Sequence, residues 1–202
     1  MKTTLRAVPL LFFLLTVFFS GSVRAKEYRL ETLEKEARKF ALSYTAKGNL
    51  PPKPQEADLL RWAADIMAAE RQCAAAISLY RQAALFSGQP DADLWLAVAR
   101  ANSCAKQWAQ ASQSGWLAYR AADNDSLRAA ALSLTGAALE KRTTSYRNWT
   151  PAAIDLYERL NTLESSSANG EKLARLRIKQ NQDKKLLIQT YTADNSSGHP
   201  RL

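Results

Sequence analysis

The sequence predicts an all-α fold, an array of antiparallel helical hairpins in which each hairpin packs on the next. Three observations support this prediction. The chain is rich in Ala and Leu, and it has only 7 Gly among 202 residues. Its apolar residues recur every three or four positions, the spacing that gathers them on one face of a helix. Small residues also recur at intervals near 35 residues, which indicates a repeated structural unit.

The first 25 residues have the features of a secretory signal peptide. Lys2 and Arg6 precede an apolar run at residues 7–19, and small residues lead up to a cleavage site after Ala25. An uncleaved anchor is the alternative, because residues 7–23 are barely long enough to span a bilayer. Cleavage predicts a periplasmic or secreted protein that meets a membrane only through this segment, before its removal.

The charge of the chain argues against nucleic acid as a partner. Cleavage would lower the formal net charge from +9 to +6, because Lys2, Arg6 and Arg24 would be lost. The remaining basic residues are mixed with Asp and Glu along helical faces, whereas nucleic-acid-binding proteins concentrate them in a patch. We therefore expect solvated helix surfaces on a single domain of 177 residues with a sizeable core.

The segment at residues 26–56 is predicted to contain an N-terminal helix and a linker. The helix is expected at about residues 27–46, with its apolar side chains on one stripe. Pro51, Pro52 and Pro54 follow, and such a cluster is typical of a stiff linker between helices. A Pro-rich ligand segment is the alternative interpretation.

Three repeat units are expected in a helical domain at residues 57–184. Small residues align their first helices: Ala64, Ala99 and Gly136 are 35 and 37 residues apart. This period is similar to that of the tetratricopeptide repeat (TPR), a helix-turn-helix unit of about 34 residues. The fold is therefore expected to be a TPR-like α-solenoid, with an insertion at residues 143–150 between the helices of the third unit.

The C-terminal segment departs from the helical pattern. Residues 186–192 predict a short strand, and a polar stretch at 194–198 follows it. We therefore expect an extended or disordered tail at residues 185–202. A strand needs a partner, and the sequence offers none, so the segment either hangs loose or begins a domain that lies outside this chain.

The two cysteines, Cys73 and Cys104, predict a disulfide. An exported protein meets an oxidising compartment, where such a bond persists. Cys73 is expected at the start of one helix and Cys104 at the end of the next, and consecutive antiparallel helices bring those two ends together. Two buried thiols are the alternative. A metal site is disfavoured because two cysteines supply only half of a tetrahedral shell.

The sequence contains no arrangement of residues that points to catalysis. The single histidine, His199, lies three residues from the C-terminus, where a catalytic group would have no rigid support. Phosphate-binding loops, nucleophile elbows and metal-binding His pairs are absent from the sequence. We therefore expect no catalytic residue, no cofactor and no metal ion.

The tryptophans offer the best candidates for partner binding. Trp95 and Trp108 fall at packing positions of the repeat, whereas Trp116 and Trp149 are less constrained. Trp149 also belongs to the insertion, and loops on a rigid scaffold often carry binding residues. Core packing is the alternative for every tryptophan, Trp62 included. The predicted partner-binding residues are Tyr146, Arg147, Trp149 and Trp116.

Several segments resemble the helical N-terminal region of bacterial alpha-2-macroglobulin-like proteins. Residues 93–101, 118–122 and 149–157 are similar to helices of that region. Residues 188–194 are similar to the place where its first macroglobulin β-domain begins. The resemblance covers about residues 59–202, through motifs that overlap generic repeat positions.

The resemblance implies a free-standing or truncated relative of an envelope protease trap. The larger proteins contain β-domains, a bait segment and sometimes a Cys-Glu-Gln thioester, and this chain has none of these, so no such residue is carried over. We expect an exported, non-catalytic protein-protein interaction module. The alternative is a structural assembly or scaffold factor of an envelope or secretion complex, with basic residues 172–185 touching membrane or peptidoglycan. The sequence sets no oligomeric state.

Overall fold

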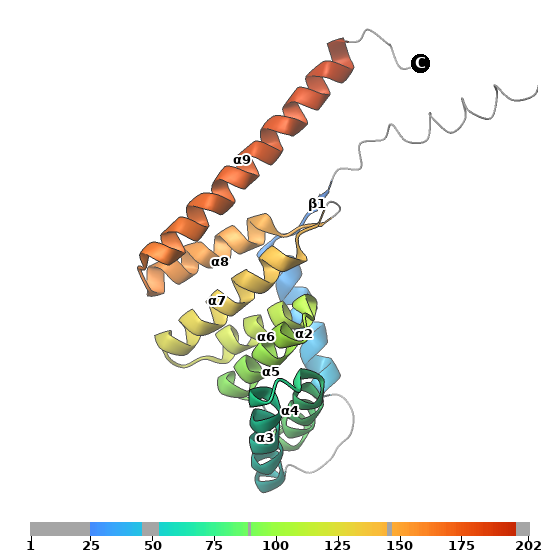
Figure 1. The fold of residues 1–202 in the computed structure, drawn as a ribbon, viewed down its shortest axis with the longest axis vertical. Helices are drawn as coiled ribbons and strands as arrows, with labels where there is room; N and C mark the ends of the chain where they lie inside the picture. Colours follow the sequence, from blue (N-terminus) through green and yellow to red (C-terminus); the bar gives the residue numbers. More distant parts are fainter. Residues whose placement is uncertain (1–24, 46–52, 89, 145–146, 197–202) are drawn as a thin grey trace, which may run out of the picture.

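The computed structural model describes residues 25–45, 53–88, 90–144 and 147–196, and these form an all-α fold, as predicted (Figure 1). Two strands of two residues each, β1 (Lys26–Glu27) and β2 (Arg147–Asn148), pair in parallel. The helices are α2 (Leu30–Thr45), α3 (Pro54–Ala69), α4 (Cys73–Ser87), α5 (Ala92–Cys104), α6 (Trp108–Ala121), α7 (Asp125–Arg142), α8 (Thr150–Leu163) and α9 (Ser167–Ser196).

The turns of the first two hairpins, α3–α4 and α5–α6, have the same backbone geometry. Arg71 and Lys106 occupy the left-handed region, with φ of 61° and 57°. In each turn, the next amide N–H donates to a carbonyl five residues earlier, at 2.8 Å, as in a Schellman motif. Arg71 and Lys106 are 35 residues apart, and so are the fully buried Ala64 and Ala99. The spacing found in the sequence is therefore present in the backbone of these two hairpins.

Two glycines allow close approach of helices in the second half of the fold. A Cβ atom on Gly136 of α7 would lie 2.9 Å from Cζ of Tyr157 on α8, a fully buried ring whose hydroxyl donates to Glu140 at 2.8 Å. A Cβ on Gly115 of α6 would collide with the Thr135 hydroxyl on α7. A larger residue at position 115 would therefore have to push α7 away from α6.

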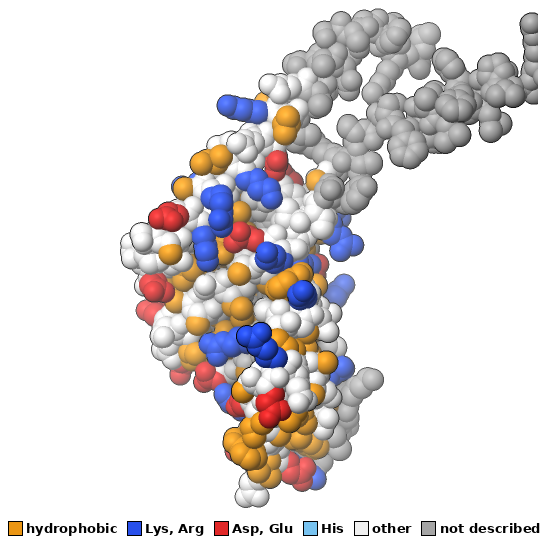
Figure 2. Space-filling view, in the orientation of Figure 1, with side chains coloured by type: hydrophobic (Ala, Val, Ile, Leu, Met, Phe, Trp, Pro, Cys, Tyr) orange, Lys and Arg blue, Asp and Glu red, His pale blue; other side chains and the backbone are white. Residues whose placement is uncertain are grey.

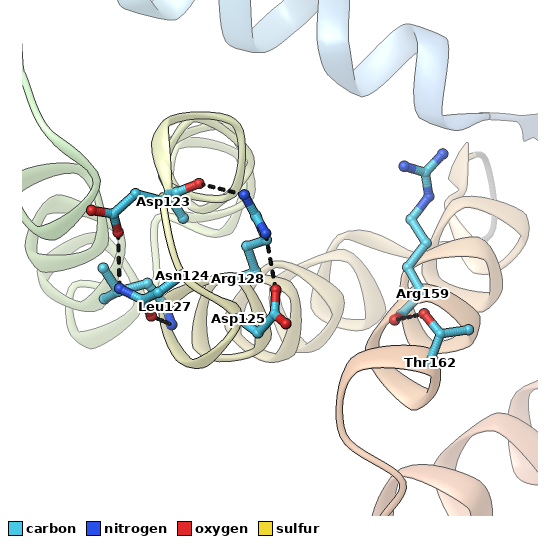
Figure 3. Close-up of polar contacts among 8 residues, drawn as sticks. Asp123, Asn124, Asp125, Leu127, Arg128, Arg159 and Thr162 are labelled. Atoms are coloured by element: carbon cyan, nitrogen blue, oxygen red, sulfur yellow. Dashed lines mark hydrogen bonds and ion pairs between the residues drawn. The ribbon is translucent and has the colours of Figure 1, made fainter.

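Side chains at the helix starts satisfy backbone groups that the helices leave unpaired. Asp91 caps α5 by accepting the amide N–H of Leu94 at 2.7 Å. Asn124 caps α7 in the same way, at 2.9 Å. Figure 3 shows this loop, where Arg128 also reaches back to the carboxylate of Asp125. These contacts fix where the hairpins α5–α6 and α7–α8 begin.

Helix α2 lies alongside the array and contacts α4, α6 and α8, the second helix of each hairpin (Figure 1). Its stripe includes Leu33 and Ala37, both fully buried, and Tyr44, which joins the cluster between α3, α4 and α5. Helix α2 corresponds to the helix expected at about residues 27–46, and it packs on the hairpins. Residues 46–52, where most of the expected linker falls, lie outside the described residues. Pro54 is already the first residue of α3, where a missing amide hydrogen costs nothing.

A buried arginine fixes α2 to the array. Arg142, at the end of α7, donates to the Glu36 carboxylate on α2 at 2.7 Å and to the Ser112 hydroxyl on α6 at 2.9 Å. Its guanidinium also stacks on the ring of Trp149, 3.8 Å from the centroid. Burial lowers the pKa of Arg142, and the hydrogen bond and charge of Glu36 oppose that shift.

The pair of short strands holds the chain immediately before α2. The amide of Tyr28 donates to the Asn148 carbonyl at 2.9 Å, and the ring of Tyr28 stacks on Trp149 with centroids 4.5 Å apart. This pairing was not predicted, because two-residue strands carry no alternating pattern of apolar and polar residues. The insertion after α7 is thus packed against the N-terminal segment.

The expected C-terminal strand at residues 186–192 is wrong, because α9 continues to Ser196. The same helix replaces the extended tail expected from residue 185; residues 197–202 lie outside the described part. A lone strand would leave its backbone groups unpaired, whereas a helix pairs them internally. Leu173 and Leu176 pack the first part of α9 on α8, and the rest extends away from the body (Figure 1).

Replacement of Glu36 by Ala should lower the free energy of unfolding by about 3 kcal/mol, because it leaves the Arg142 guanidinium buried without its carboxylate. Urea unfolding followed by circular dichroism measures the loss. The control is Glu34→Ala on the same helix, whose partner Arg38 is largely exposed, and it should cost about 0.5 kcal/mol or less. Equal losses for the two variants would contradict this assignment.

Replacement of Gly136 by Ala should destabilise the protein, although Ala is the better helix former by about 1 kcal/mol. The added methyl group must displace the buried Tyr157 ring, and overpacking of this kind costs about 1–3 kcal/mol, so a net loss near 1 kcal/mol is expected. Gly170→Ala in α9 is the control, since nothing lies within 4 Å of its added Cβ. Thermal unfolding should show opposite signs for the two substitutions.

Candidate interaction surface

The structure places two of the predicted partner-binding residues in the core. Trp149 is 1% exposed and Trp116 is 4% exposed, so neither ring forms a surface. This corrects the sequence-based expectation: the insertion folds back on Tyr28, and Trp149 fills the space between them. Arg147 is exposed on β2, whereas Tyr146 lies outside the described residues. The four candidates therefore do not form one contact surface.

A different tryptophan is exposed, on α3. Leu59, Trp62 and Ile66 are 66%, 65% and 36% exposed, and we call them the α3 stripe. Their spacing of three and four residues puts them on one face of the helix, opposite the buried Ala57 and Ala64. Figure 2 shows apolar side chains gathered at this end of the molecule. The same spacing was visible in the sequence, but it did not reveal which face would be covered.

The α3 stripe is exposed because α3 is the first helix of the hairpin array. Helix α3 packs on α4, with a smaller contact to α5. In an array, each interior helix has neighbours on both sides, whereas a terminal helix keeps one face uncovered. In soluble repeat proteins that uncovered face is normally polar. The stripe is apolar, so α3 has two apolar faces and only one of them is buried.

The disulfide between Cys73 and Cys104 is present, as predicted, with Cα atoms 5.9 Å apart. It joins the start of α4 to the end of α5, which are adjacent because these consecutive helices run in opposite directions. The bond therefore attaches the terminal α3–α4 hairpin to the rest of the array.

A cavity of about 340 Å³ lies beside the disulfide, and we call it the disulfide pocket. It is formed by helices α3, α4 and α5. Three alanines and the disulfide give it apolar walls, and an acidic, a basic and a phenolic side chain complete it. The lining residues are Asp65, Ala68, Cys73, Tyr80, Ala97, Arg100, Ala101 and Cys104.

The polar groups of the disulfide pocket have defined partners, with one exception. The hydroxyl of Tyr80, a residue that is nearly fully buried, donates to the carboxylate of Asp65 at 2.5 Å. Burial and this carboxylate raise the pKa of Tyr80, so the phenol stays protonated at neutral pH. Nearby, Arg61 pairs with Asp91 at 3.4 Å. No hydrogen bond or ion pair joins Arg100 to another residue in the described part of the chain.

A second cavity, of about 380 Å³, lies between α2 and α8. Its acidic residues include Glu31, Asp155 and Glu158, and burial together with the charge of Glu158 raises the pKa of Asp155. The side chain of Arg159 extends from α8 toward α2 within this cavity (Figure 3). Within residues 25–196, as far as the structure describes them, no three His, Cys, Asp or Glu side chains are grouped to hold a metal ion.

The comparisons with known proteins give no relative. No family model, no curated protein and no solved structure matches the chain. No helix in the described part of the chain is both long and apolar enough to cross a membrane. His199 lies outside the described residues.

Replacement of both cysteines by Ser should lower the free energy of unfolding by about 3–4 kcal/mol. The bond closes a loop with a sequence separation of 31, and its loss frees the unfolded chain. Urea unfolding of the variant and of the oxidised protein gives the difference. Titration of thiols in denatured, unreduced protein should find none, and two free thiols would refute the pairing.

Proposed function

We propose that this chain is an exported, non-catalytic interaction module that binds a partner protein through the α3 stripe. One observation carries the proposal: α3 has two apolar faces, and the face with Leu59, Trp62 and Ile66 is exposed. Clustered exposed apolar side chains mark interaction sites in monomeric proteins. Tryptophan in particular is enriched among the residues that dominate binding energy.

The surroundings of the stripe support this role. The buried face of α3 packs on α4, and the disulfide joins α4 to α5, so little conformational entropy is lost when a partner binds. The opposite surface of the array, along α4, α6 and α8, is already covered by α2. A partner therefore has the α3 end of the molecule and the faces of α3, α5 and α7 available.

The same proposal includes export of the protein and kinship with macroglobulin-like proteins. The disulfide is compatible with an oxidising compartment, and the proposed cleavage after Ala25 falls directly before β1. Kinship with the helical region of macroglobulin-like proteins is proposed only for the helical segments between residues 93 and 157. The part of the resemblance at residues 188–194 lies in α9, which is helical.

A scaffold role is the second candidate, and one observation favours it. The distal part of α9, beyond Leu176, extends away from α8 and carries Lys179, Lys184 and Lys185 together with the exposed Ile178 (Figure 1). A helix placed in this way can bridge two components of an assembly. The two candidates use opposite ends of the molecule, so an experiment can separate them.

A photo-crosslinking amino acid at position 62 should capture a discrete protein partner in living cells of the source organism, because Trp62 is the centre of the α3 stripe. The same label at position 178 on α9 provides the matched exposed control. Leu59→Glu should abolish the crosslink from position 62 through burial of a charge in the interface. Electrophoresis and mass spectrometry of the crosslinked product measure each outcome.

The pattern of crosslinks decides between the candidates. A partner captured from position 62 alone supports the interaction module, and a partner captured from position 178 alone supports the scaffold role. A crosslink from position 62 that persists after Leu59→Glu would show that the stripe is not the contact surface.

A further inference from the structure

The disulfide pocket is lined by two residues of opposite charge, both of them exposed to solvent. Asp65 belongs to α3 and Arg100 belongs to α5, and both line the same cavity. No ion pair joins these two side chains, so their charged atoms lie more than 4.0 Å apart. The methyl groups of Ala68, Ala97 and Ala101 line the same cavity. The cavity therefore offers an anionic group, a cationic group and an apolar surface.

We propose that the disulfide pocket binds a small zwitterion, an α-amino acid with a compact apolar side chain. The ammonium group of such a ligand pairs with the Asp65 carboxylate, and its carboxylate pairs with the Arg100 guanidinium. The side chain lies against the alanines and the disulfide. This inference does not depend on the proposed function, because the α3 stripe uses another face of α3.

The charges of the pocket discriminate against ligands of other classes. A simple anion would pair with Arg100 but would also approach Asp65, and a simple cation would meet the reverse conflict. A neutral apolar molecule would displace water from both charged groups without replacing its hydrogen bonds. Only a ligand that carries both charges can pair with Asp65 and Arg100 at once.

The contacts of the residues in and around the pocket favour such a ligand. The Tyr80 hydroxyl holds the Asp65 carboxylate at 2.5 Å, and Tyr80 itself is fixed by its burial in α4. Arg61 is engaged by Asp91, so Arg100 is the guanidinium available at the cavity. The volume of about 340 Å³ lies at the lower end of the range for ligand pockets, which suits one amino acid.

Titration with three related compounds tests the proposal. L-leucine carries both charges, L-leucinamide keeps only the ammonium group, and N-acetyl-L-leucine keeps only the carboxylate. Amide resonances of α3, α4 and α5 in the purified, disulfide-bonded protein should shift saturably with L-leucine. Each blocked compound should bind at least about tenfold more weakly, which corresponds to the loss of one charged hydrogen-bonded contact of about 1.4 kcal/mol.

Two variants test which pocket residue pairs with each charge of the ligand. Arg100→Met should remove the advantage of L-leucine over L-leucinamide, because the carboxylate of L-leucine then has no partner. Asp65→Asn should make L-leucine and N-acetyl-L-leucine bind equally, for the converse reason. Lys141→Met on α7, an exposed position outside the pocket, should leave L-leucine binding unchanged. Circular dichroism and the thermal midpoint verify that each variant is folded.

Two results would overturn the proposal. One is the absence of saturable shifts in the pocket with L-leucine up to its solubility. The other is binding of either blocked compound as tightly as L-leucine, which would show that the pocket does not recognise both charges.

Discussion

Apolar packing and the contacts of one buried side chain, Arg142, hold α2 on the array. This side chain leaves the end of α7 and meets Glu36 on α2 and Ser112 on α6, and it stacks on Trp149 at the start of α8. Four helices therefore converge on one guanidinium. The Arg142 side chain is only 9% exposed, so burial of its charge would be costly without a carboxylate beside it. Glu36 provides that carboxylate. This requirement sets the register of α2 along the array.

The two ends of the molecule are stabilised in different ways. Around Arg142, large side chains from α2, α6, α7 and α8 form one apolar cluster, which the stacked Tyr28 extends to β1. At the other end, α3 and α4 contribute mainly alanines to the core, and alanine buries little apolar area. The disulfide adds a covalent constraint there, where a terminal hairpin has neighbours on one side only.

Helix α3 meets three different environments on its faces. One face packs on α4 through Ala57 and Ala64, a second contributes Asp65 and Ala68 to the disulfide pocket, and the third exposes Leu59, Trp62 and Ile66. A partner protein and a small ligand could therefore both act on α3 without competing for the same side chains. Both candidate sites lie at the end of the molecule opposite the Arg142 contacts.

Local patterns in the sequence determined the all-α fold, the 35-residue spacing, the Asp91 cap and the cysteine pairing. Each of these depends on neighbours in sequence or on the antiparallel order of consecutive helices. The tertiary structure decided the rest: that Trp149 is buried while Trp62 is exposed, that α2 covers the second helices, and that α9 continues through the segment expected to be a strand. The sequence shows which faces of a helix are apolar. It does not show which face a distant segment will cover, because that depends on contacts such as Tyr28 on Trp149, between residues more than 100 positions apart.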